Sequence, residues 1–220
     1  MVKEDKLNKF SVSLGLLDYI NPIFYAITIY TIISNIYPSM QAPYNYILII
    51  GAIISLFFGF IIPTGKVMVG LGIIKFRMPV SLVFCVNSGI LLSGLMLLKY
   101  VMSISLTTLI VITIFIIMTL IWIYLKSKKI NTIAVLTWAF WYLLMYISLI
   151  TLAIRNNIVL PIILYSIAII LYSIAILLFV MLCGIGIKAD LKNPKVHWVI
   201  EISNVVCQWL VALATTILFF

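Results

Sequence analysis

The last hydrophobic segment of the chain carries four polar side chains at helical spacing. His197, Glu201, Asn204 and Gln208 follow one another at intervals of 4, 3 and 4 residues, which places them on one face of a helix. The rest of the segment is apolar. Ionisable and amide side chains inside a bilayer are costly, and they usually face the protein interior or a water-filled path. The stripe therefore predicts a site for a polar solute or an ion.

The first hydrophobic segment has a similar face. Asp18, Asn21, Tyr25 and Thr28 are spaced by 3, 4 and 3 residues, and Pro22 directly follows Asn21. Because proline has no N–H to donate to the carbonyl of Asp18, the helix should kink there, beside a carboxylate and an amide. Broken helices of this kind line binding sites in transporters.

Counted from the same side of the membrane, polar residues of three segments fall at one depth: Asp18, Asn21, Asn87, Glu201 and Asn204. We expect Asp18 and Glu201 to bind a proton or a cation. The amides and a hydroxyl would hydrogen-bond a small polar or cationic solute, through Asn21, Asn87, Ser88, Asn204 and Gln208.

Structural explanations of the same residues stay open. His197 and Glu201 could cap the start of their helix, where acidic groups favour the helix dipole. Asp18 could lie among headgroups beside an ordinary proline kink, and the amides could serve only as interhelical hydrogen bonds, worth about 1 kcal/mol each. With one histidine, no Cys-x-x-Cys pair and no HExxH or GxSxG pattern, we expect no metal, no cofactor and no catalytic residues.

The elements that must position these side chains are membrane spans. The 220 residues are 65% hydrophobic and 9% charged, against about a quarter charged in soluble domains. Runs of about 20 apolar residues can each cross the bilayer as a helix. We predict an all-α integral membrane domain over residues 1–220, with seven spans at about 13–36, 45–63, 80–98, 104–125, 131–153, 158–182 and 198–219.

Basic residues alternate with these spans. Twelve of the 14 Lys and Arg residues fall on the N-terminal side of the membrane, whereas Lys99 and Arg155 fall on the other. The positive-inside rule places the N-terminus in the cytoplasm and the C-terminus outside. The net charge of +9 is therefore topogenic, with affinity for the lipid bilayer surface and not for nucleic acid. The Ile- and Lys-rich composition suggests a low-GC genome. We expect a multi-pass protein of a prokaryotic cytoplasmic membrane.

The chain also shows a weak internal similarity. Residues 67–79 resemble 180–194, and each stretch leads into a span with an asparagine. Residues 11–100 and 130–220 would then form a 3+1+3 parallel repeat around a peripheral linker helix at 104–125. Chance recurrence in a biased composition explains the pattern as well. The layout is similar to that of three-plus-one-plus-three sugar transporters, but their Pro-Gln signature is absent, and we assign no membership.

Three function hypotheses follow. The first is a small transporter or channel for a polar or cationic solute, proton-coupled through its carboxylates. The second is a non-catalytic subunit of a larger membrane complex or a homo-oligomer, in which small-residue seams at Gly51, Ser55 and Gly59 and at Gly89 and Ser93 would contact a partner. The third is a membrane-embedded lipid-modifying enzyme.

Overall fold

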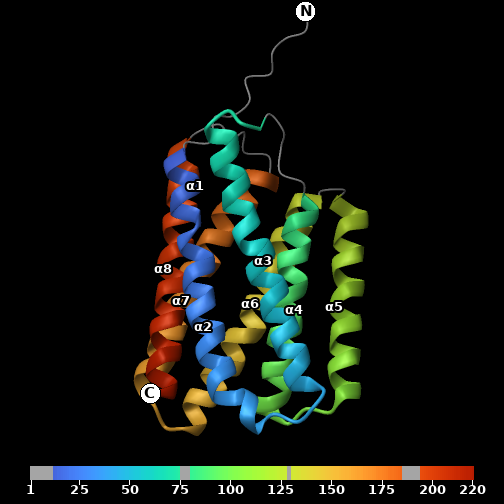
Figure 1. Cartoon of the computed structure of the whole chain (residues 1–220). Coiled ribbons are helices and arrows are strands. Elements are labelled where there is room, and N and C mark those ends of the chain that lie inside the picture. The colour runs from blue at the N-terminus through green and yellow to red at the C-terminus, as the bar shows by residue number, and fades with distance from the viewer. Residues whose placement is uncertain (1–11, 75–79, 128–129, 185–193) are drawn as a thin grey trace, which may run out of the picture.

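A computed structural model describes residues 12–74, 80–127, 130–184 and 194–220 as one helical bundle (Figure 1). The helices run up and down, so that α1 begins at the end of the bundle opposite to the one where α8 stops. Their bounds are α1 Val12–Asp18, α2 Ile20–Ile36, α3 Tyr44–Gly70, α4 Val80–Met102, α5 Leu106–Ser127, α6 Ile130–Arg155, α7 Val159–Gly184 and α8 Pro194–Phe219, with a 3-10 turn at Tyr37–Ser39.

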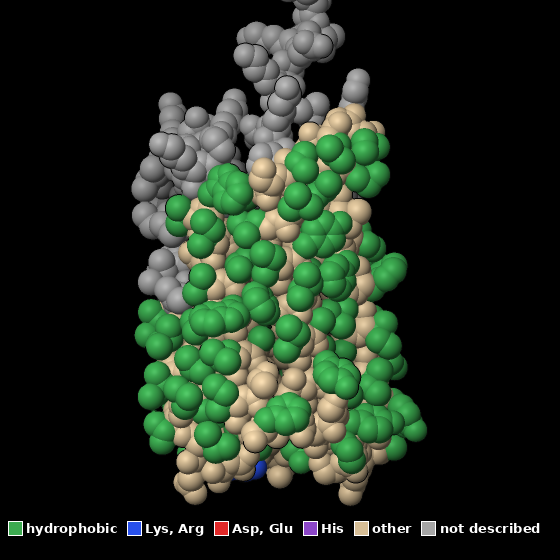
Figure 2. All heavy atoms as spheres, turned by 60° about the vertical axis from the view of Figure 1, so that its left-hand side comes forward, with side chains coloured by type: hydrophobic (Ala, Val, Ile, Leu, Met, Phe, Trp, Pro, Cys, Tyr) green, Lys and Arg blue, Asp and Glu red, His purple; other side chains and the backbone are tan. Residues whose placement is uncertain are grey.

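Six helical segments in the described part are long and apolar enough to cross a membrane, which confirms six of the predicted spans. They are Val12–Ser39, Tyr44–Gly70, Ser81–Met102, Leu106–Leu125, Leu136–Arg155 and Glu201–Phe219. In the remaining predicted span, α7 is helical over Val159–Gly184, but its apolar stretch is described only for Val159–Ile170. The outer face in Figure 2 is covered by hydrophobic side chains, as lipid contact requires.

Close packing of small residues joins α3 to α4. A Cβ atom added at Gly51 would lie 2.7 Å from Oγ of Ser93 and 2.8 Å from the carbonyl oxygen of Gly89. Gly89 in turn meets the backbone of Ser55. The two predicted seams therefore pack against each other within the chain. They are not available as the contact faces that the subunit hypothesis needed.

The helix α5 lies at the edge of the bundle, as predicted for the segment 104–125 (Figure 1). Only 11% of its span is buried, against 50% for the span in α4. Large side chains such as Phe115 and Trp122 are mostly exposed, at 73% and 60%. The 3+1+3 repeat that this position would suit stays a prediction.

Candidate functional site

The first span is broken where the carboxylate lies. The helix α1 ends at Asp18 and α2 begins at Ile20, with the N–H of Tyr19 donating to the carbonyl of Leu16 at 3.2 Å. Pro22 cannot donate to the carbonyl of Asp18, and the break between the two helices lies where the kink is predicted. Across the break, Nδ2 of Asn21 donates to Oδ1 of Asp18 at 3.0 Å.

A glycine lets the broken helix approach α3 closely. A Cβ atom at Gly15 would lie 2.8 Å from Cγ2 and 3.0 Å from the backbone nitrogen of Val67. Any larger residue would push α1 away from this part of α3. Because Lys66 directly precedes Val67, the contact brings that lysine alongside Asp18.

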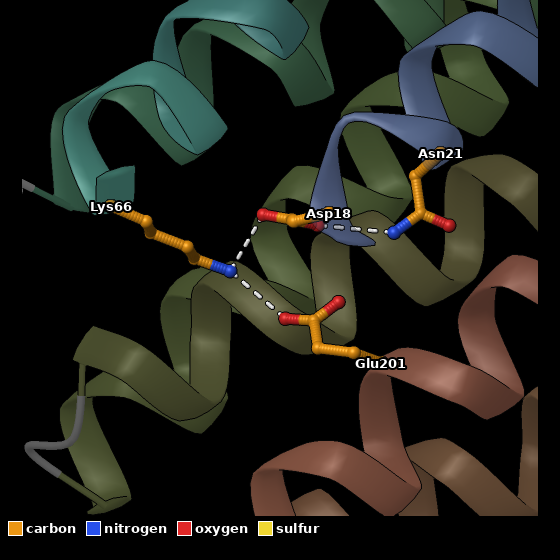
Figure 3. A network of polar contacts seen from close by, with 4 residues as sticks. All are labelled: Asp18, Asn21, Lys66 and Glu201. Carbon is orange, nitrogen blue, oxygen red and sulfur yellow. Dashed lines mark hydrogen bonds and ion pairs between the residues drawn. The ribbon is translucent and has the colours of Figure 1, made fainter. Parts of the chain in front are cut away.

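The ammonium group of Lys66 joins two carboxylates from two other helices (Figure 3). Its Nζ lies 2.7 Å from Oδ2 of Asp18 and 2.9 Å from Oε1 of Glu201. The lysine side chain is 20% exposed and each acidic side chain 12%. We call Asp18, Lys66 and Glu201 the ion triad. It lies roughly 6 to 10 Å inside the end of the bundle at which α1 begins.

Two buried oxygen atoms beside the ion triad are left without a hydrogen-bond partner among the described residues. They are Oε2 of Glu201 and Oδ1 of Asn21. Buried acceptors are costly when they stay unpaired. The site thus offers two acceptor oxygens to a proton, a cation, water or a solute donor, besides those held by Lys66.

The sequence pattern does not single out Lys66. The predicted second span ends at 63, and Lys66 is one of the twelve basic residues assigned to the N-terminal side of the membrane. In the structure α3 continues through Pro63 to Gly70. The signal was the seam itself, because Lys66 follows Gly51, Ser55 and Gly59 along the same packed face.

The polar stripe of α8 runs from the ion triad into the core. Gln208 lies about 10 Å deeper than Glu201 and is 3% exposed, and its Oε1 has no hydrogen-bond partner among the described residues. Asn204, between them, is partly exposed. Glu201 pairs with Lys66 about two turns inside α8, so it does not cap that helix. The side chain of His197 lies outside the described residues.

Further along the first span, the same face also points inward. Tyr25 is 4% exposed and its hydroxyl accepts a hydrogen bond from Oγ of Ser55 at 3.0 Å. Its ring packs edge-on against Tyr142, with centroids 6.2 Å apart. Tyr142 belongs to an aromatic group on α6 that is buried in the core with Trp141 and Tyr146. These rings therefore pack against one another and against Tyr25 in the core.

Asn87 and Ser88 do not join the ion triad. Nδ2 of Asn87 donates to the carbonyl of Ala134 on α6 at 3.0 Å, and Oγ of Ser88 donates to the carbonyl of Cys85. Both residues line a separate cavity between α4, α5 and α6. The structure therefore brings together Asp18, Asn21 and Glu201 from the expected layer and leaves Asn87 apart.

Among the described residues, no group of three His, Cys, Asp or Glu side chains could hold a metal ion. Comparison of the chain with protein-family models, with curated proteins and with solved structures found no match.

Proposed function

We propose that the chain is a small membrane carrier or channel for a polar or cationic solute, coupled to a proton or a monovalent cation at the ion triad. The observation that carries the proposal is one ammonium group shared by two carboxylates from different helices. Fully ionised, Asp18, Lys66 and Glu201 have a net charge of −1. A net charge at a poorly hydrated site is unfavourable. Binding one proton or one monovalent cation neutralises the net charge of the ion triad.

The geometry supports exchange at this point. A flexible four-carbon side chain attaches the ammonium group of Lys66 to α3, so this group can move away from the carboxylates when another cation binds them. The partial exposure of the three side chains gives water a route to them. The oxygens of Asn21 and Glu201 that have no partner among the described residues would then complete the coordination of the incoming ion.

The amides along α8 favour a path that continues inward. Asn204 and Gln208 lie on the same face as Glu201, and the acceptor oxygen of the deeper Gln208 has no partner in the part of the chain that the structure describes. A solute with several hydrogen-bonding groups would exchange its hydrogen bonds to water for hydrogen bonds to these two amides. The chain supplies polar groups on its interior and apolar ones on its outer face, which is the arrangement that a transport path requires.

The test is charge movement on a solid-supported membrane that carries proteoliposomes. Steps in pH and in Na⁺ concentration should each be applied to the wild type, to Glu201→Gln and to Lys99→Gln, whose lysine lies at the opposite end of the bundle. We expect a transient current in the wild type and in Lys99→Gln for at least one of the two ions, and loss of that current in Glu201→Gln. Currents equal to those of empty liposomes for all three proteins would refute the proposal.

A further inference from the structure

The cavity between α4, α5 and α6 lies apart from the ion triad and has a different chemistry. Its volume is about 350 Å³, at the lower end of the range of ligand-binding sites. Its walls are formed mainly by apolar and aromatic side chains, including Phe84, Leu91, Ile117 and Trp141. None of the described residues that line it carries a charge.

The cavity is accessible from the membrane. Ile117, Ile121 and Tyr124 of α5 line it and are nevertheless 43%, 48% and 40% exposed. These residues belong to the helix that is least buried in the bundle. A molecule dissolved in the bilayer can therefore reach the cavity from the side, past α5.

Asn87 supplies the polar feature of this cavity. The residue is 1% exposed, and its Nδ2 is bound to the carbonyl of Ala134. Its Oδ1 is buried without a partner among the described residues. The hydroxyl groups of Ser88 and Thr137, which also line the cavity, donate to carbonyls of their own helices at 2.7 Å. The oxygen of Asn87 is thus an acceptor that lacks a donor.

We propose that this cavity binds an uncharged single-chain amphiphile with a hydroxyl group, taken from the bilayer. The alkyl chain fills the apolar space, and the hydroxyl group donates to Oδ1 of Asn87. The volume suits one chain, and the uncharged lining suits a neutral headgroup. This inference does not depend on the function proposed for the ion triad.

Trp141 allows binding to be measured directly, because it is 2% exposed and lines the cavity. In full-length protein whose other tryptophans are replaced by phenylalanine, a dibrominated fatty alcohol should quench Trp141 fluorescence at lower concentration than the matching dibrominated alkane does. We expect the alcohol to reach half of its quenching at a concentration about fivefold lower than the alkane, the ratio that one net hydrogen bond of about 1 kcal/mol gives. A parallel variant that retains only Trp209, which is 48% exposed, reports ordinary lipid contact and should show no such preference.

Two substitutions test the roles of the oxygen and of the space. Asn87→Leu should remove the preference for the alcohol while the alkane still quenches. Leu91→Phe narrows the cavity and should weaken quenching by both probes. Because it leaves the hydrogen bond from Asn87 to Ala134 in place, it still tests the proposal if Asn87→Leu fails to fold. Ser88→Ala is the matched control and should keep the preference. The proposal would be overturned if both probes quenched the wild type equally and Leu91→Phe did not change that quenching. It would also be overturned if neither probe quenched Trp141.

Discussion

Lys66 and Glu201 are 135 residues apart in the chain, yet Nζ of the lysine donates to Oε1 of the glutamate at 2.9 Å. The helix α1 packs against both α3 and α8, and its last residue, Asp18, accepts the same ammonium group. Three separate spans therefore meet at one cation. The site exists only when the two ends of the chain are assembled.

Removing Lys66 alone should destabilise the protein more than removing Lys66 together with one of its two carboxylates does. Lys66→Met leaves two partly buried carboxylates facing each other, and we expect a loss of about 1–3 kcal/mol in unfolding free energy, below the 3–5 typical of fully buried pairs. The double variant Lys66→Met/Glu201→Gln should recover part of this loss. Thermal unfolding in detergent measures both. A double variant less stable than the single one would contradict this account.

The approach of α1 to α3 should be sensitive to one methyl group. Gly15→Ala places a Cβ atom 2.8 Å from Val67, so α1 must shift and Asp18 must move away from Lys66. We expect a lower melting temperature and a smaller ion-evoked current. Gly59→Ala is the control, since its Cβ atom would meet Pro22 at an ordinary 3.6 Å. Equal effects of the two substitutions would argue against a special role for Gly15.

The seam between α3 and α4 should tolerate no side chain at Gly51. Alanine there would lie 2.8 Å from backbone atoms of α4, which cannot move as a flexible side chain can, and overpacking of this kind costs about 1–3 kcal/mol. Gly94→Ala, whose nearest neighbours lie at 3.6 to 3.9 Å, should be nearly neutral. The yield of monodisperse protein and its melting temperature provide the comparison.

The orientation in the membrane can be tested with single cysteines in a background where Cys85, Cys183 and Cys207 are replaced. Leu71→Cys, after α3, should react with an impermeant maleimide only after the cells are opened. Asn156→Cys, after α6, should react in intact cells. Both positions are exposed. The reverse labelling pattern would show that the N-terminus lies outside, against the positive-inside rule.

The features that could be predicted from the sequence are those that depend on the local chemistry of one or two residues. Pro22 indicated the broken first span, and the small residues at Gly51 and Gly89 indicated a close helix contact. In both cases the side chain itself, or its absence, imposes the structure. The spacing along α8 likewise placed Glu201 and Gln208 on one face.

The positions of Lys66 and Asn87 could not be predicted in the same way. The apolar piece after Lys66 could be a helical extension or an interfacial segment, and composition does not distinguish the two. The helix α3 continues through Pro63, as a span can when neighbouring groups satisfy the freed carbonyl. For Asn87, counting residues gives a depth along the membrane normal but not the direction around the bundle axis. Asn87 therefore shares a depth with Asn21 and points toward a different neighbour.

The shallow position of the ion triad has an electrical consequence. A charge that crosses the whole membrane at 100 mV changes in energy by about 2.3 kcal/mol. An ion entering from the near end traverses at most about a third of the roughly 30 Å core before it meets Asp18 and Glu201. Most of the voltage drop lies beyond the ion triad, so membrane potential should act chiefly on exchange with the far compartment.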